Sequence, residues 1–157
     1  MTLETIDMSE KLEAIWQQHG GDWRSKAYRA DKAALWGYVQ SSENINGCGV
    51  ISGAEKETLY EKSLSYARIS LVETPIGLWI HAITWASLTC GGGYAPSTST
   101  AIAHKSRQGA RLAAIEKLIC RYSSIEVERG YSESESKQAL EVLRILNDEK
   151  TPQLALW

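Results

Sequence analysis

The sequence contains no phenylalanine, although it has six tryptophans and seven tyrosines. Trp and Tyr carry a polar group that Phe lacks, so they suit interfaces and stacking on nucleic-acid bases as well as protein cores. Cysteine is also scarce: the three cysteines, Cys48, Cys90 and Cys120, are odd in number and widely spaced. Such a set does not form a disulfide framework, and it favours a protein of the reducing cytosol.

Long apolar runs and a strong net charge are absent as well. No hydrophobic stretch approaches a membrane span, and residues 1–21 are net acidic without the apolar segment of a signal peptide. We therefore expect a cytoplasmic protein with no membrane partner. The formal net charge of −2 gives no global field toward nucleic acid. The 157 residues, 43% of them hydrophobic and 23% charged, are the length and composition of a globular domain.

Motifs for catalysis and metal binding are missing too. The sequence has no CxxC or HxxxH spacing, and the "CGGGYAPS" segment at 90–97 lacks the Gly-Lys-Ser/Thr of a Walker loop. We expect no metal and no cofactor, and we favour a protein that is not an enzyme. One alternative stays open. Cys90 with His81 or His104 as its base, or a metal held by the cysteines and histidines, would make the chain an enzyme.

Apolar residues at helical spacing predict five helices, over residues 8–18, 24–39, 54–63, 106–122 and from Ser132 or Ser134 to about 148. Ser9 is expected to cap the first helix and Ser106 the fourth, and Gly20-Gly21 is expected to end the first. The fourth helix has the strongest pattern, with Leu112, Ile115, Leu118 and Ile119 as its apolar face.

Alternating and β-branched residues predict two strands, over residues 65–73 and 78–87, joined by a turn at 74–77. Residues 98–104 are a possible third strand or a lead into the next helix, and 41–53 and 90–97 are expected to be loops. The predicted fold is α+β, a small antiparallel sheet packed against helices, with helices at both ends. We expect one domain over residues 1–150, with a core over about 54–122, and a flexible C-terminal peptide over 151–157.

Basic residues gather on one side of the predicted helix 106–122. At 100° per residue, Arg107, Arg111, Lys117 and Arg121 project within about a third of the circumference. Such a basic face suits the phosphate backbone of a nucleic acid, and the backbone N–H groups at the start of the helix also favour an anion. The ordinary explanation of a charge run is a solvated helix surface. Tyr94 follows three glycines and Trp85 precedes them, so both are candidates for contact with a base. The expected nucleic-acid contacts are therefore Lys105, Ser106, Arg107, Arg111, Lys117, Arg121, Tyr94 and Trp85.

Two loose resemblances agree with this interpretation. The element order predicted over 54–122 resembles that of a double-stranded-RNA-binding domain, and "HKSRQGARLAA" is similar to that family's Lys-Lys-x-Ala-Lys-x-x-Ala-Ala through Lys105, Ala110 and Ala113-Ala114. The hairpin followed by an Ala-rich helix also resembles phage single-strand annealing proteins. Both resemblances imply nucleic-acid binding.

The last five residues, "QLALW", resemble the bacterial sliding-clamp-binding peptide, whose pattern is Gln-Leu, then Ser or Asp, then Leu-Phe. Gln153, Leu154 and Leu156 match it, Ala155 replaces the small polar residue, and Trp157 replaces Phe. The resemblance implies recruitment to the replication clamp through Gln153, Leu154, Leu156 and Trp157. The alternative is that these apolar residues pack on the chain's own domain as an edge strand or lid.

Together these features predict a small non-enzymatic accessory protein of DNA replication or recombination, from a bacterium, phage or mobile element. It would bind nucleic acid, with DNA as the preferred form, through the basic helix, and it would bind the clamp through its C-terminal peptide. The rival hypothesis is a phage or plasmid counter-defence protein that inhibits a host protein, using a Trp-rich surface and the acidic last helix.

Overall fold

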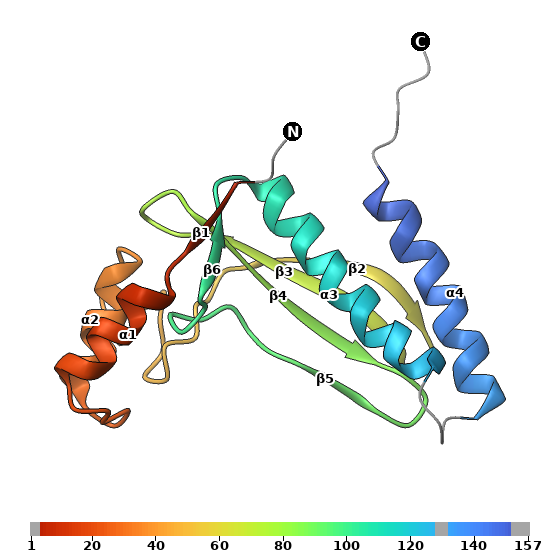
Figure 1. Ribbon diagram of the computed structural model, residues 1–157, viewed down its shortest axis with the longest axis horizontal. Coiled ribbons are helices and arrows are strands. Elements are labelled where there is room, and N and C mark those ends of the chain that lie inside the picture. Colours follow the sequence, from red (N-terminus) through yellow and green to blue (C-terminus); the bar gives the residue numbers. More distant parts are fainter. Residues whose placement is uncertain (1–3, 128–131, 152–157) are drawn as a thin grey trace, which may run out of the picture. The chain divides into compact units, whose positions relative to one another are not determined.

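The computed structural model describes residues 4–127 and 132–151, and within them it contains four helices and six strands. The helices are α1 (Ser9–Gln18), α2 (Lys26–Leu35), α3 (Arg107–Val127) and α4 (Glu133–Lys150). The strands are β1 (Thr5–Asp7), β2 (Glu55–Lys62), β3 (Ser65–Glu73), β4 (Trp79–Ala86), β5 (Gly91–Gly93) and β6 (Ile102–His104). The sheet has the order β1-β6-β4-β3-β2, and β5 pairs with β4 (Figure 1). This confirms the α+β class.

The chain divides into two compact units. Unit 1 comprises residues 1–55, 70–82 and 95–110, and unit 2 comprises 56–69, 83–94 and 111–157. Strands β3 and β4 and helix α3 each contribute residues to both units. The single domain expected over residues 1–150 stays a prediction, and the two units are described separately below. Of the C-terminal peptide expected over 151–157, only Thr151, the C-cap of α4, belongs to the described residues.

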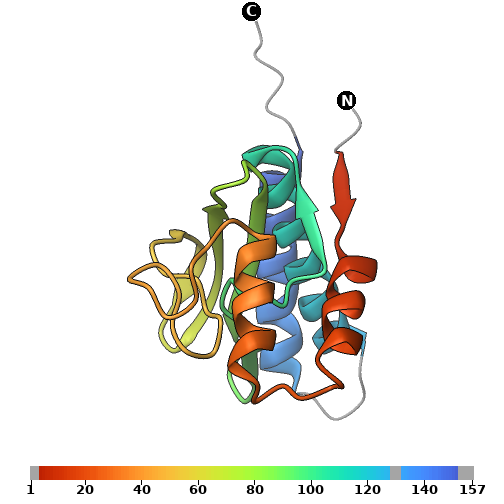
Figure 2. The ribbon, with the colours of Figure 1, turned by 90° about the vertical axis from the view of Figure 1, so that its left-hand side faces the viewer.

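Unit 1 is built around Trp36, whose side chain is fully buried among apolar residues. The indole Nε1 donates a hydrogen bond of 3.0 Å to the carbonyl oxygen of Thr98, so its one polar group is satisfied inside the core. Helices α1 and α2 lie side by side, as both ribbon views show (Figure 2). Strand β1 pairs with β6 in antiparallel register, Thr5 opposite His104. The short β1 strand was not predicted from the sequence.

The ends of the first two helices differ in part from expectation. Helix α1 begins at Ser9, with Met8 in the capping position and no side-chain cap, so Ser9 is not the cap. The Ser9 backbone N–H instead donates to the Asp7 carboxylate at 2.8 Å. The predicted end is confirmed, because Gly20 and Gly21 have φ angles of 64° and 73°. Helix α2 covers only part of the expected 24–39, since it starts after the capping hydroxyl of Ser25 and ends at Leu35.

The prediction of a helix over 54–63 is wrong, because this segment forms strand β2. The segment is rich in Glu, Lys and Leu, which favour helices, but β2 pairs with β3, and this pairing outweighs the local preference. Ser63 has a left-handed φ of 55° between the two strands, which lets the chain reverse there without a glycine.

The predicted hairpin is confirmed as β3 and β4. Its turn is held by Thr74, whose N–H and hydroxyl both donate to the Leu78 carbonyl at 2.8 and 2.9 Å, and Gly77 takes the left-handed position with φ 79°. The third strand is β6, shorter than the expected 98–104. The 90–97 segment is not only a loop, because Gly91–Gly93 forms β5 against β4.

Helices α3 and α4 begin at the caps expected from the sequence. The Ser106 hydroxyl accepts from the Gly109 N–H at 3.0 Å, and the Ser132 hydroxyl accepts from the Glu135 N–H at 3.2 Å. Helix α3 extends beyond its predicted end. In unit 2 it lies beside α4, where Lys150 forms an ion pair with Glu116 at 2.9 Å (Figure 1 and Figure 2). The Tyr122 hydroxyl lies 2.8 Å from the Tyr66 carbonyl and 3.1 Å from the Ala86 carbonyl, which fixes α3 to β3 and β4.

Candidate nucleic-acid interface

Helix α3 buries a different set of residues from the one expected. Its buried positions up to residue 125 are Gly109, Ala110, Ala114, Ile115, Leu118, Tyr122 and Ile125. Leu112 and Ile119, expected to face the core, are only partly buried. At 100° per residue Leu118 projects between Arg107 and Arg111, so the buried stripe and the basic residues occupy the same sector. The helix therefore lacks the separate basic face that the sequence predicted, because its cations share one sector with its buried residues.

Arg111 is held by two carboxylates of its own chain. Its Nε and Nη2 donate to the two oxygens of Glu57 at 3.0 and 2.7 Å, and Nη2 also donates to Glu149 at 2.6 Å. The arginine side chain is only 14% exposed. The hydrogen bonds that Arg111 donates to Glu57 are the largest cause of its raised pKa, against the opposing effect of burial. Phosphate would therefore have to displace both carboxylates to reach Arg111.

The start of α3 carries two further ion pairs, both within unit 1. Lys105 pairs with Glu4, and Arg107 pairs with Glu55 at 2.8 Å. The Ser106 hydroxyl is used as the helix cap. Lys105 and Arg107 are about half exposed, so these pairs contribute little to stability and phosphate could compete for them. The nucleic-acid contacts predicted here stay predictions.

Three of the predicted residues do come together, in unit 2. Tyr94, Lys117 and Arg121 line a pocket of about 240 Å³ together with Ile83, Cys120 and Ser124, and we name it the Tyr94 pocket. The Lys117 ammonium donates to the Tyr94 hydroxyl at 3.1 Å and lies 5.3 Å from the centre of its ring. Among the residues that the structure describes, Arg121 has no ion-pair partner.

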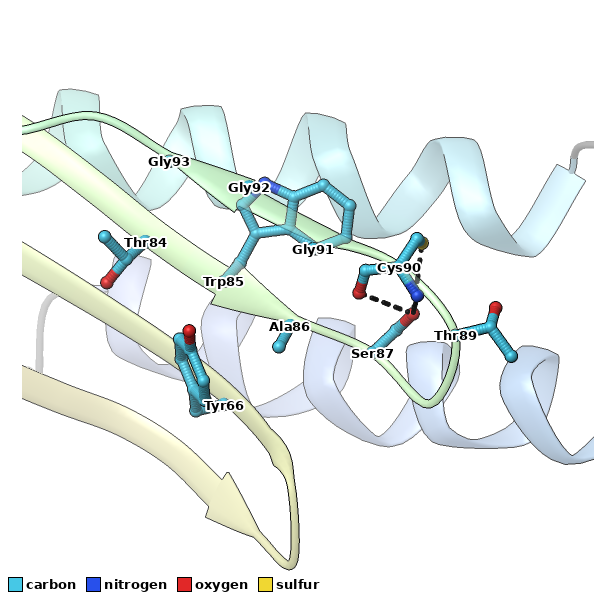
Figure 3. A pocket seen from close by; sticks show the side chains of 10 residues that line it. All are labelled: Tyr66, Thr84, Trp85, Ala86, Ser87, Thr89, Cys90, Gly91, Gly92 and Gly93. Carbon is cyan, nitrogen blue, oxygen red and sulfur yellow. Dashed lines mark hydrogen bonds between the residues drawn. The ribbon is translucent and has the colours of Figure 1, made fainter.

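Trp85, the remaining predicted contact, lines a larger space in unit 2. This shallow hollow of about 480 Å³ is formed by Tyr66, Thr84–Ser87 and Thr89–Gly93, and we name it the glycine hollow (Figure 3). Gly92 is the cross-strand partner of Trp85, and a Cβ on Gly92 would lie 3.5 Å from the indole nitrogen. The indole also meets Tyr122 edge-on at 5.9 Å. Trp85 therefore covers the bare glycine backbone on the side of α3.

A buried carboxylate supports the turn between β4 and β5. Glu135, 3% exposed, accepts hydrogen bonds from the backbone and hydroxyl of Thr89 at 3.2 and 2.5 Å and from the Ser87 hydroxyl at 3.3 Å. The Thr89 hydrogen bond is the main reason that the pKa of Glu135 is lowered, against the opposing effect of burial. The Ser-x-x-Glu spacing from Ser132 is a capping-box pattern visible in the sequence, but nothing local shows that Glu135 reaches the β4–β5 turn.

The residues considered for catalysis have other partners. In unit 1 the His81 Nδ1 and His104 Nε2 atoms lie 3.0 Å apart in a buried hydrogen bond, and in unit 2 the Cys90 thiol lies 3.2 Å from the Ser87 hydroxyl. Within residues 4–127 and 132–151 no group of three His, Cys, Asp or Glu side chains is close enough to hold a metal ion.

Comparisons with known proteins give no relative. No protein-family model matches the chain, and neither does any curated protein or any solved structure. None of the helices in the described part of the chain is long and apolar enough to cross a membrane.

Proposed function

We propose that this protein is a small accessory protein of DNA metabolism that binds nucleic acid at the Tyr94 pocket and is recruited to the replication clamp by residues 153–157. The observation that carries the proposal is the convergence of one aromatic ring and two cations, Tyr94, Lys117 and Arg121, around one pocket. A ring can stack on a base while neighbouring ammonium and guanidinium groups bind its phosphate.

The size of the Tyr94 pocket supports a chain-like ligand. Its volume of about 240 Å³ is below the range of about 300–1,000 Å³ that holds a whole small molecule. A pocket of this size fits one group of a longer ligand, such as one base or one phosphate. Tyr94 is 40% exposed and Arg121 is exposed, so both remain accessible to such a ligand.

The test is the affinity of a fluorescently labelled oligonucleotide, measured by anisotropy over a series of salt concentrations. Lys117→Ala with Arg121→Ala should weaken binding and lower the slope of log K against log salt by about 1.4–2 units, since each lost phosphate contact removes about 0.7–1 unit. The matched control is Lys62→Ala with Lys137→Ala, which removes the same charge from exposed positions of unit 2. Equal slopes for both pairs would exclude the Tyr94 pocket as a phosphate site.

Recruitment to the clamp rests on the sequence of residues 153–157. Two leucines and one tryptophan offer about 1.5–3 kcal/mol each of gross burial energy, from which the ordering of the peptide subtracts. A synthetic peptide of these residues should bind the bacterial sliding clamp in the micromolar range, at about −8 kcal/mol. Leu156→Ala with Trp157→Ala should abolish binding, and Gln153→Ala should weaken it by about 0.5–1.5 kcal/mol through lost hydrogen bonds.

Deletion of residues 153–157 separates this proposal from packing on the chain's own domain. If the peptide is a recognition segment, the truncated protein should melt within about one degree of the full chain, because about 1 kcal/mol corresponds to ~2–4 °C at this size. A loss of several degrees, with a peptide that has no affinity for the clamp, would show that Leu154, Leu156 and Trp157 belong to the core.

The rival counter-defence hypothesis expected a Trp-rich surface. Of the five tryptophans in the described residues only Trp23 is exposed, at 59%, and Trp36 is fully buried. The Arg24 guanidinium lies 5.0 Å from the Trp23 ring and covers part of it. One exposed indole is less than that hypothesis requires, so we favour nucleic acid as the partner.

A further inference from the structure

The glycine hollow opens on the side of the strands that faces away from α3 and α4. Figure 3 shows both helices behind the strands, and the side chains of Tyr66 and Thr84 in front of the strands. The alternation along β3 agrees, since Ser65, Ala67 and Ile69 are buried and Tyr66 and Arg68 between them are only half-buried. Tyr66 of β3 and Thr84 of β4 thus lie on one face of the sheet, beside the glycine strand β5, which has no side chains.

The glycines of β5 are required by the close approach of β4. A Cβ on Gly91 would lie 2.8 Å from the Trp85 carbonyl oxygen, and one on Gly93 would lie 2.6 Å from that of Ile83. Two hydrogen bonds set the register of the antiparallel pair of β4 and β5. The Tyr94 N–H donates to the Ile83 carbonyl, and the Ser87 N–H donates to the Cys90 carbonyl. In that register the N–H and C=O groups of Gly91 and Gly93 point away from β4, toward the edge of β5 that pairs with no other strand of the described residues, which we call its free edge.

None of the residues that line the glycine hollow is acidic, but two carboxylates lie close to it. Ser87 and Thr89 donate to the buried Glu135, and Arg68, whose guanidinium lies 4.1 Å from the centre of the Tyr66 ring, is paired with Glu61 at 3.3 Å. The cation that suits an anionic ligand is therefore Lys117, which lies over Tyr94 and forms no ion pair among the described residues. Backbone N–H groups at a glycine edge are also donors that a phosphate oxygen can approach closely.

We propose that the glycine hollow binds an unpaired base of single-stranded nucleic acid, stacked on Tyr66, while the adjoining phosphate lies along the β5 edge toward Lys117. This inference rests on the proposed function and adds the form of the ligand. The hollow of about 480 Å³ lies within the range of about 300–1,000 Å³ typical of small-ligand sites, which is enough for one nucleotide. A base inside a duplex is paired and stacked on its neighbours, so it cannot reach a ring on a sheet.

The helix argues against a duplex as the main ligand. Arg111, which would contact a double-stranded backbone along α3, is only 14% exposed and is bound to Glu57 and Glu149, so Arg107, with its exposed pair to Glu55, is the one arginine at this end of the helix that phosphate could reach. A peptide strand added to the β5 edge is the other chemistry that the free edge suggests. It is less favoured, because β5 has only three residues and no side chains to form specificity pockets.

The experiment compares a labelled single-stranded 15-mer with a hairpin duplex of the same sequence. The wild type should bind the single strand at least ten times more tightly. Tyr66→Ala should reduce single-strand affinity about 5- to 150-fold, the equivalent of about 1–3 kcal/mol for one stacked base. Tyr66→Phe should keep the affinity, since it keeps the ring. Tyr38→Ala, which removes a half-buried tyrosine beside a separate hollow in unit 1, is the matched control.

A second variant keeps the test decisive if Tyr66→Ala does not fold. Thr84→Glu adds an acid to the glycine hollow and should also weaken single-strand binding at least fivefold, whereas Thr58→Glu, at an exposed position of β2, should not. Equal binding of both nucleic-acid forms, with Tyr66→Ala and Thr84→Glu unchanged, overturns the inference. The proposed function survives that result if Lys117→Ala with Arg121→Ala still weakens binding, and both proposals fail if no nucleic acid binds. Capture of a peptide at the β5 edge without nucleic-acid binding would also overturn the inference.

Discussion

Substitution of Arg111 decides whether α3 uses its arginines to bind a ligand or to hold the fold. The Arg111 side chain connects three elements of unit 2, because it lies on α3 and binds Glu57 of β2 and Glu149 of α4. Arg111→Ala would leave two carboxylates facing each other in place of a bidentate pair. If α3 instead acts as the sequence predicted, the same change would remove a phosphate contact and leave stability almost unchanged.

The size of the expected effect follows from the burial of the cluster. Exposed ion pairs contribute about 0–1 kcal/mol, and breaking a fully buried pair costs about 3–5 kcal/mol. Arg111 is 14% exposed, whereas Glu57 and Glu149 are 36% and 45% exposed, so the cluster lies between these limits. We expect a loss of about 2 kcal/mol, which corresponds to a fall in Tm of ~4–8 °C at ~2–4 °C per kcal/mol.

Thermal melting followed by circular dichroism, with urea titration, measures this loss. Arg111→Lys is the control, because an ammonium keeps the charge but cannot make the two-pronged contact with Glu57, and it should recover only part of the stability. Oligonucleotide affinity and its salt slope are measured on the same samples. An Arg111→Ala protein with unchanged Tm and a salt slope lower by about one unit would refute the structural role and restore the basic-face hypothesis.

Two further results are expected. The pKa of Glu135 is lower in the folded protein than in the unfolded chain, so this carboxylate stabilises the fold at any pH above its unfolded pKa. That stability is lost as the pH falls through the folded pKa. Glu135→Gln should therefore flatten the decline of Tm below about pH 4.5. Single-stranded oligonucleotide bound in the glycine hollow should change the fluorescence of Trp85, whose indole covers the same glycine strand from the α3 side, and a signal that survives Trp85→Phe but disappears in Trp79→Phe would contradict this assignment.

Much of the fold could be predicted from local patterns. The β3–β4 hairpin follows from alternation and from a Pro-Gly turn, and α3 and α4 follow from apolar spacing with serine caps at Ser106 and Ser132. Strand β2 could not be predicted this way, because its composition favours a helix and only its partner β3 makes it a strand. The three-glycine strand β5 has no side-chain pattern at all, and it forms because backbone pairing with β4 needs none.

The candidate site could be predicted only in part, for the same reason. The helical projection correctly placed the four basic residues of α3 on one side, but it could not show that Leu118 is buried in the same sector. The partners of Arg111 are 54 and 38 residues away in the sequence, so no local spacing indicates them. The proximity of Tyr94 to Lys117, 23 residues apart, likewise depends on how β5 and α3 fold together.

The charge distribution bears on our proposal that one chain combines a clamp-binding peptide with a weak nucleic-acid site. Most of the basic residues near α3 are balanced by carboxylates, and the net charge of −2 gives no long-range attraction to DNA. A site with Tyr94, Lys117 and Arg121, extended by one stacked base on Tyr66, makes few contacts and should bind weakly and with strong salt dependence. Attachment to a clamp already encircling DNA would supply the missing affinity as effective concentration, without any additional contact to the nucleic acid. The two weak interactions are therefore each useful only when both can form at once, and loss of either should reduce recruitment to DNA far more than the affinity of that single contact suggests.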